Sequence, residues 1–154
     1  MSIIIRAATA ADVATIARFN AAMAWETEGL TLDGERVRRG VEAVLADPSK
    51  GFYWVAELDG RPAGQMLVTP EWSDWRNGAF WWIQSVYVEP PCRGRGVFRA
   101  LYEHAERRAR SEPGVCGLRL YVEQHNERAQ QVYLRLGMKP TPYRIFEVDF
   151  VLNR

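Results

Sequence analysis

Short runs of β-branched and aromatic residues predict six strands along this chain. They are expected at Ile3 to Ala7, Phe52 to Leu58, Ala63 to about Val68 or beyond, Phe80 to Val88, Val115 to Val122 and Ile145 to Leu152. Asp59-Gly60, between the second and third runs, is the strongest hairpin signal in the sequence, so these two strands are expected to pair. The last run alternates regularly, with Phe146, Val148 and Phe150 on one side.

Apolar residues at three- and four-residue spacing predict four helices between these strands. The first starts at Thr9-Ala10-Ala11-Asp12, which is close to a capping box, and is expected to run to about Ala24. The others are expected at Glu35 to Ala46 with Asp33 as its cap, Val97 to Arg110, and Asn126 to about Leu136 before Gly137. Two segments lack a clean period and are expected to be irregular: Trp25 to Leu30 and Glu71 to Gly78.

The resulting order of elements is β-α-α-β-β-β-α-β-α-β. This order is typical of an α+β domain built on a mixed sheet. No linker, internal repeat or low-complexity segment interrupts the pattern, so a single domain of residues 1–154 is expected.

Composition narrows the class of protein. With 47% hydrophobic and 25% charged residues the chain is globular, and a net charge of +1 does not resemble a nucleic-acid binder. No run approaches 18 apolar residues and the N-terminus lacks the pattern of a signal peptide, so no membrane association is expected. Two cysteines make no disulfide framework, which favours a reducing cytoplasm.

The stretch from Ile83 to Tyr102 carries the first candidate chemistry. Two prolines stop the preceding strand, and Arg93-Gly94-Arg95-Gly96 then leads directly into a helix, whose unpaired N–H groups and dipole favour an anion such as phosphate. A P-loop is excluded because no lysine or hydroxyl follows Gly96, and a dinucleotide fingerprint is excluded because Arg99 stands at its third glycine. An anion site and a purely structural turn both stay open at this point.

A second motif downstream, read together with the first, resembles the GNAT superfamily, the Gcn5-related N-acetyltransferases. The family's acyl-CoA signature, Arg/Gln-x-x-Gly-x-Gly/Ala, is matched by Arg93 and Gly96, with Phe98 in the last place. Its second signature, Asn-x-x-Ala-x-x-x-Tyr-x-x-x-Gly-Phe, is matched by Asn126, Ala129, Tyr133 and Gly137, with Met138 in the aromatic place. The resemblance implies a mostly antiparallel central sheet and an acyl-CoA co-substrate, acetyl-CoA by default.

The resemblance also implies which residues hold the donor. Backbone groups of Val86, Tyr87 and Val88 would bind the pantetheine arm, and Asn126 would bind pantetheine or cap its own helix. The pyrophosphate would lie on backbone N–H groups of Arg93, Gly94, Arg95, Gly96, Val97, Phe98 and Arg99. Arg93 and Arg95 would add charge, although Arg95 equally suits a solvent-facing role. In the family the last strands splay apart beside the donor, here at Gly117 or at Glu123-Gln124.

Tyr133 is the candidate general acid. When an amine attacks the thioester directly, the departing CoA thiolate needs a proton, and a phenol with a pKa of about 10 stays protonated and can donate it. The alternative is a core tyrosine, because Ala129, Val132 and Leu136 form an apolar face around it.

The attacking amine must lose a proton, usually to a carboxylate. Glu26 and Glu28, after the first helix, and Glu123, at the end of a strand, are the candidate catalytic bases, and the alternative for each is a charged side chain of a solvated loop. Asp74, between Trp72 and Trp75, is a further candidate, whereas Gln84 cannot act as a base. An acceptor site with carboxylates and aromatic rings would suit a small cationic or aromatic amine.

Other chemistries find no support in the sequence. The two histidines and two cysteines lack any zinc spacing, so no metal is expected, and no neighbouring base supports an acyl-Cys92 intermediate. We therefore expect an acyl-CoA-dependent N-acyltransferase that transfers the acyl group directly to an amine of a small molecule or peptide. A non-catalytic CoA- or acyl-CoA-binding sensor module is the alternative. Pairing into a homodimer is compatible with the family.

Overall fold

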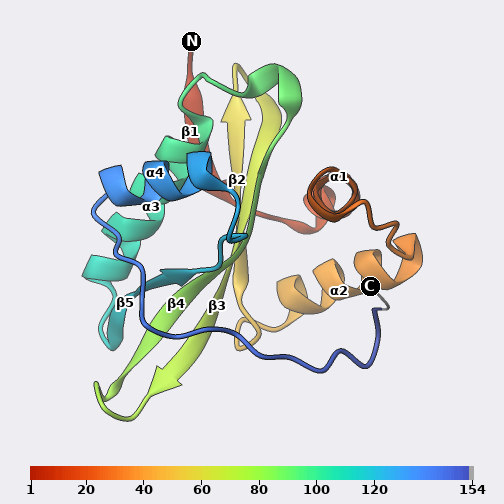
Figure 1. Cartoon of the computed structure of the whole chain (residues 1–154). Helices are drawn as coiled ribbons and strands as arrows, with labels where there is room; N and C mark the ends of the chain where they lie inside the picture. The colour runs from red at the N-terminus through yellow and green to blue at the C-terminus, as the bar shows by residue number, and fades with distance from the viewer. Residues whose placement is uncertain (153–154) are drawn as a thin grey trace. The chain divides into compact units, whose positions relative to one another are not determined.

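The computed structural model describes residues 1–152 and divides the chain into two compact units, Met1–Leu120 and a second that begins at Tyr121 (Figure 1). The first unit contains the whole sheet and three helices, and the second contains one helix. The first unit comprises β1 Ile3–Ala7, α1 Val13–Glu28, α2 Gly34–Ala46, β2 Phe52–Leu58, β3 Arg61–Ser73, β4 Gly78–Val88, α3 Val97–Ser111 and β5 Val115–Leu120. Single 3-10 turns, Ala10–Asp12 and Pro90–Cys92, precede α1 and α3, and α4 spans Glu127–Arg135.

The sheet has the strand order β1-β2-β3-β4-β5, with β1 to β4 antiparallel and β5 parallel to β4. The predicted Asp59-Gly60 hairpin is confirmed. Both residues are left-handed, with φ of 50° and 83°, which gives the two-residue turn that matches the twist of its strands. The mixed, mostly antiparallel sheet expected from the sequence is also confirmed.

Strands β3 and β4 extend further than the sequence predicts. Trp72 pairs with Ala79 and Ser73 with Gly78, so Glu71 to Ser73 belong to β3 and only a four-residue turn separates the two strands. Asn77 has a φ of 48°, a left-handed conformation that asparagine tolerates and that lets the chain reverse tightly. The expectation of an irregular connection over this whole segment is therefore wrong.

Helices cover both faces of the sheet (Figure 1). On one face Ile16 of α1 and Val41 of α2 pack against Tyr53 and Val55 of β2. On the other face the Trp54 ring meets the edge of His104 on α3, with the ring centroids 4.7 Å apart. Period-two strands with both faces buried and helices with one apolar stripe produce this three-layer arrangement.

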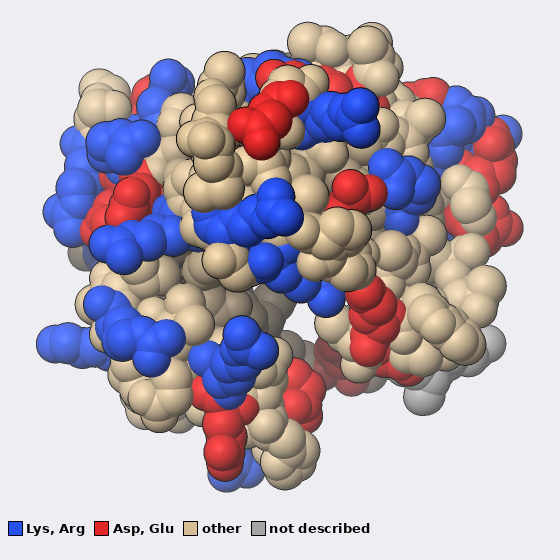
Figure 2. Space-filling view, turned by 90° about the horizontal axis from the view of Figure 1, so that it is seen from above, with Lys and Arg blue, Asp and Glu red and all other residues tan. Residues whose placement is uncertain are grey.

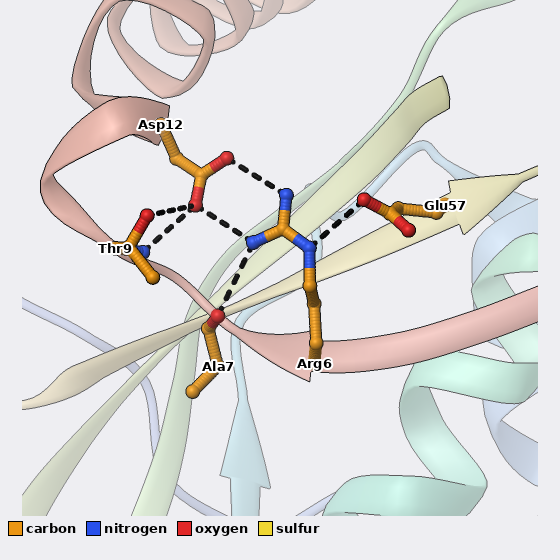
Figure 3. Close-up of polar contacts among 5 residues, drawn as sticks. All are labelled: Arg6, Ala7, Thr9, Asp12 and Glu57. Carbon is orange, nitrogen blue, oxygen red and sulfur yellow. Dashed lines mark hydrogen bonds and ion pairs between the residues drawn. The ribbon is translucent and has the colours of Figure 1, made fainter. Parts of the chain in front are cut away.

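A polar network fixes the corner between β1 and α1 (Figure 3). Both terminal nitrogens of Arg6 donate to the Asp12 carboxylate, at 2.8 and 2.9 Å, and Nε donates to Glu57 at 2.9 Å. The backbone N–H of Thr9 donates to the same Asp12 carboxylate at 2.7 Å, which confirms the capping box predicted there. A bidentate arginine–carboxylate pair that also caps a helix sets where α1 begins.

Helix α1 is longer than predicted, which corrects the assignment of Trp25 to Leu30. The helix continues through Glu28 and ends at Gly29, whose φ of 62° is left-handed and whose N–H bonds back into the last turn. Glu26 and Glu28 therefore lie on the last helical turn. Gly29 therefore ends the helix. The apolar periodicity in the sequence ends before the helix does, since the Trp25 side chain is 63% exposed and does not continue the buried face.

The predicted last strand, Ile145 to Leu152, does not form in the described residues. Alternation gives a strand only if a neighbouring strand accepts the backbone hydrogen bonds. Here the Asp149 carboxylate accepts the N–H groups of Val151 and Leu152, both at 2.8 Å, so a local turn uses donors that a ladder would need. This expectation was wrong.

Charged side chains of both signs are intermixed on the face of the molecule shown in Figure 2. Charged side chains also pair along single helices of the structure: Arg39 pairs with Glu35 on α2, and Arg99 pairs with Glu103 on α3. This distribution agrees with a chain of 20 basic and 19 acidic residues.

Candidate active site

Strand β4 has an open edge beyond the point where β5 stops. The parallel ladder ends with Ile83 opposite Leu120, whereas β4 continues to Val88 beside β3 alone. Gly117 lies inside the paired region opposite Phe80, so it does not mark the opening, contrary to one of the two expectations. A Cβ there would lie 2.6 Å from the Phe80 ring, so glycine is needed for packing.

A bulge marks the start of the open edge. Leu67 pairs with Ser85 but Val68 pairs with Ile83, which leaves Gln84 as the extra residue of β4. Gln84 is exposed although it lies in the middle of the sheet's longest hairpin. Bulges bend a strand and re-aim its side chains, and this one falls where β4 and β5 part.

The direction of the backbone groups on the open edge follows from one hydrogen bond. The N–H of Glu89 donates to the carbonyl of Ala63 at 2.8 Å, so these opposite residues form a hydrogen-bonded pair. Because such pairs alternate along an antiparallel ladder, Val88 and Val86 present their N–H and C=O groups away from β3. Tyr87 directs its own groups toward β3. Two of the three predicted pantetheine residues thus have outward-facing backbone groups.

The glycine turn opens α3 as predicted. Gly94 and Gly96 are left-handed, with φ of 75° and 84°, and a Cβ at either would meet nothing within 4 Å, so conformation rather than crowding requires glycine. The N–H of Arg93 already bonds Pro90, whereas the first-turn N–H groups of α3 have no acceptor within the helix. Phe98 packs its ring beside Tyr102, with the centroids 6.4 Å apart.

The Arg93 side chain turns back onto β4 and α1. Its Nε donates to the Val88 carbonyl at 2.8 Å, its Nη2 lies 3.1 and 3.3 Å from the two oxygens of Glu26, and its guanidinium carbon lies 5.4 Å above the Tyr87 ring. A second ion pair, between Arg18 and Glu89 at 2.8 Å, joins the same elements. Glu26, a candidate base, and Arg93, a candidate phosphate-binding residue, therefore form an ion pair.

Tyr87 completes this group of side chains. It is 6% exposed, and its ring lies 5.4 Å from the guanidinium carbon of Arg93. Burial is the main cause that raises the pKa of Tyr87, and the neighbouring Glu26 carboxylate raises it further. The phenol therefore stays protonated at neutral pH.

Of the other candidate bases in the first unit, Glu28 lies on the last turn of α1, and Asp74 lies in the turn before β4. Because β4 rises about 3.3 Å per residue, Asp74 is roughly 30 Å along the strand from Val88. Asp74 therefore does not share an end of the sheet with the glycine turn.

The second unit contains the other predicted residues on one short stretch. Asn126 caps α4, because its Oδ1 accepts the N–H of Ala129 at 3.1 Å. Glu123 accepts the N–H of His125 at 2.7 Å in the turn before the helix. Burial raises the pKa of Tyr133, on α4, so its phenol is protonated at neutral pH.

Comparison with known proteins gives the family. The model of the acetyltransferase (GNAT) family matches residues 12–138, which include both motifs. The chain belongs to the acetyltransferase (GNAT) family. This confirms the family resemblance and the fold class expected from the sequence.

Individual GNAT relatives agree with this. A mycothiol acetyltransferase of Beutenbergia cavernae is 35% identical over 115 residues, which are 75% of this chain and 36% of that protein. This chain spans only 23% to 40% of the length of the mycothiol acetyltransferases that it matches. A solved structure described as a possible acetyltransferase from Clostridium difficile 630 is 40% identical with a TM-score of 0.90, covering 99% of this chain and all of that one.

A more distant structure has the same fold. An aminoglycoside N-acetyltransferase in complex with CoA is 17% identical with a TM-score of 0.78, and the match covers 97% of this chain and 95% of that one.

Sequence patterns did not reveal which residues of this candidate site pair with one another. Glu26 and Arg93 are 67 positions apart and Arg18 and Glu89 are 71 apart, so no local spacing relates them. The Gln84 bulge is likewise visible only in the strand register.

Within residues 1–152 no group of three His, Cys, Asp or Glu side chains is placed to hold a metal ion. No helix in that range is long and apolar enough to cross a membrane.

Proposed function

We propose that this GNAT protein is an acyl-CoA-dependent N-acyltransferase that transfers an acyl group, acetyl by default, directly to an amine of a small molecule or peptide. The observation that carries the proposal is the open edge of β4, which the short 3-10 turn Pro90–Cys92 joins to the glycine turn that starts α3. Family membership and the downstream motif around Asn126 and Tyr133 support it.

The residues at the open edge fit the donor. The outward N–H and C=O groups of Val86 would pair with the amides of pantetheine, as a neighbouring strand would, whereas the Val88 carbonyl already accepts a hydrogen bond from Arg93. The backbone N–H groups from Gly94 to Arg99 would hold the pyrophosphate at the positive end of the α3 dipole, with added charge from Arg95. The open space at Gly94 and Gly96 suits close approach of a ligand to the backbone.

In the proposed reaction the amine nitrogen attacks the thioester carbonyl. A C–N bond forms, the C–S bond breaks, and the CoA thiolate takes the proton of the Tyr133 phenol. The proton lost by the amine passes to a carboxylate directly or through water. Glu26, Glu28 and Glu123 are the candidates for this acceptor, and the two oxygens of Glu26 lie 3.1 and 3.3 Å from Nη2 of Arg93.

The remaining expectations belong to the same proposal. The family match crosses from the first unit into the second, which supports residues 1–154 as one acyltransferase domain. The free thiols of Cys92 and Cys116 fit the reducing cytoplasm. Pairing of two copies is compatible with the proposal.

Two measurements test the proposal. Titration calorimetry with CoA and acetyl-CoA should show binding of one molecule per chain. Thiol release from acetyl-CoA should then be screened against polyamines, amino acids, aminoglycosides and peptides, and against the small thiol compounds to which the name mycothiol acetyltransferase points. Binding without turnover for any acceptor would favour the non-catalytic sensor, and absence of CoA binding would reject both.

A further inference from the structure

The last turn of α1 and the start of the glycine turn meet through three side chains: Glu26, Tyr87 and Arg93. We call them the Glu26 cluster. Arg93 donates from Nε to the Val88 carbonyl and from Nη2 to both oxygens of Glu26, while its guanidinium lies over the Tyr87 ring. The cluster therefore joins three elements: a helix, a strand and a turn.

The geometry leaves the Arg93 side chain little freedom. A guanidinium is planar and rigid, and this one bonds on two sides while its face lies over an aromatic ring. Tyr87 is almost fully buried, so its ring is a fixed platform, packed against Phe19 of α1 with the centroids 5.4 Å apart. Fixing Arg93 also fixes the backbone at the first residue of the Arg-Gly-Arg-Gly turn.

The contact also involves the proposed donor edge. The Val88 carbonyl is one of the backbone groups that face away from β3, and Arg93 already occupies it. This leaves the groups of Val86 for pantetheine and defines the path by which the chain leaves β4. The Arg18–Glu89 pair restrains the same departure from the other side of Pro90.

We propose that Glu26 is a positioning residue, which holds Arg93 and thereby keeps the turn of residues 89–96 in the shape that binds the acyl-CoA pyrophosphate. Glu26 then does not take the proton of the amine. This inference rests on the proposed function for its role in donor binding, although the restraint of the turn exists without any ligand.

If Glu26 instead competed with the donor for Arg93, removal of Glu26 would change the affinity for CoA in the opposite direction. If Arg93 had to leave Glu26 to bind a phosphate, the carboxylate would compete with the donor, and its removal would tighten CoA binding. If Glu26 positions Arg93, the same removal weakens binding. Substitution of Glu26 by glutamine, which keeps the size of the side chain and removes its charge, separates the two.

Calorimetry with CoA should compare Glu26→Gln, Arg93→Gln and the double variant with the unmodified protein. Partly exposed ion pairs contribute about 1 kcal/mol at most, so each single variant should raise the Kd about threefold to fivefold. The double variant should bind CoA no more weakly than the weaker-binding of the two single variants, because both substitutions remove the same restraint. A decrease of the Kd in Glu26→Gln, or losses that add fully, would overturn the proposal.

Glu106→Gln is the matched control. Glu106 is 35% exposed and pairs with Arg110 at 3.0 Å, and Glu26 is likewise 35% exposed with Arg93 at 3.1 Å. Glu106 lies on α3, far along the helix from the glycine turn. Its substitution should leave the Kd for CoA within the error of the measurement.

A second readout needs no ligand. The N–H of Cys92 bonds Glu89 at 2.9 Å and that of Arg93 bonds Pro90 at 3.3 Å. In free Glu26→Gln protein both amides should exchange with deuterium severalfold faster, and in Glu106→Gln they should not. Unchanged exchange would overturn the inference, whereas failure of the unmodified protein to bind CoA would reject only the proposed function.

Kinetics separate positioning from proton transfer. Glu26→Gln should raise the KM for acetyl-CoA about threefold to fivefold, with kcat at saturating donor and its pH profile preserved. A fall of kcat by a hundredfold or more, with loss of the acidic limb of the profile, would identify Glu26 as the base and refute the positioning role.

Discussion

Tyr133 illustrates how chemistry at the scale of one residue depends on its surroundings. Its phenol is a plausible proton donor only while it is protonated, and burial raises its pKa above the ordinary value. Asn126, seven positions earlier, has a local function as the cap of α4 whatever else it binds. A motif residue can therefore serve its helix and a ligand together.

Replacement of Tyr133 by phenylalanine should lower kcat about a hundredfold or more, because a positioned general acid contributes roughly that factor. The Kd for CoA should change less than twofold. Since the pKa of Tyr133 is raised, its ionisation should not limit the rate of the unmodified enzyme below a pH of about 10.

Tyr143→Phe is the control for this variant, because Tyr143 is a 72% exposed tyrosine of the same unit. It should leave kcat unchanged. Full turnover by Tyr133→Phe with the best acceptor would show that the thiolate obtains its proton elsewhere.

At the scale of helices and strands, residues close in the sequence decided most of the boundaries. Packing or pairing with other elements decided the remaining ones. Strand β2, Phe52–Leu58, was predicted with its observed bounds, because its residues and the following Asp-Gly turn act locally. Helix α1 continues beyond the end of its apolar periodicity and ends at Gly29. The expected strand at Ile145 to Leu152 failed, because alternation alone cannot supply a neighbour.

The pairing of β4 with β5 depends on one glycine. Gly117→Ala would place a Cβ 2.6 Å from the Phe80 ring, and the guanidinium carbons of Arg76 and Arg119 lie 4.8 and 3.6 Å from the centroid of that ring. Because the ring cannot shift easily, the substitution should lower the free energy of unfolding by about 1 to 3 kcal/mol, as urea unfolding would measure.

Gly40→Ala provides a comparison of opposite sign. Gly40 lies inside α2, is exposed, and a Cβ there meets nothing within 4 Å. Alanine should raise the free energy of unfolding by about 0.5 to 1 kcal/mol, because it favours the helix. Equal effects of the two substitutions would contradict the close packing inferred at Gly117.

At the scale of the whole molecule, the partly buried Arg6–Asp12 pair links folding to pH (Figure 3). The hydrogen bonds from Arg6 are the main cause that lowers the pKa of Asp12 from its ordinary value of 3.8. A carboxylate with a lowered pKa in the folded state stabilises it at pH values above the unfolded pKa. That contribution is lost as the pH falls below about 4 toward the folded-state pKa.

Asp12→Asn should therefore lower the free energy of unfolding by about 2 kcal/mol at pH 7, because it leaves Arg6 without its bidentate partner. The difference from the unmodified protein should shrink between pH 4 and pH 2, where Asp12 itself becomes protonated. Glu42→Gln, which removes an exposed carboxylate on α2, should change stability by less than about 0.5 kcal/mol. A difference that stayed constant with pH would exclude the proposed linkage.

The sequence alone determined the order of elements up to α4, the Asp59-Gly60 hairpin, the glycine turn before α3 and the two motifs of the family. These features depend on residues that are close in the chain, through dihedral preferences, capping and periodicity. Only the tertiary structure decided that Val86 and Val88 face the open edge of β4, because that depends on the register with β3 and on where β5 stops. Only the tertiary structure joined Glu26 to Arg93, because an ion pair between side chains 67 positions apart forms only after α1 has packed against the sheet.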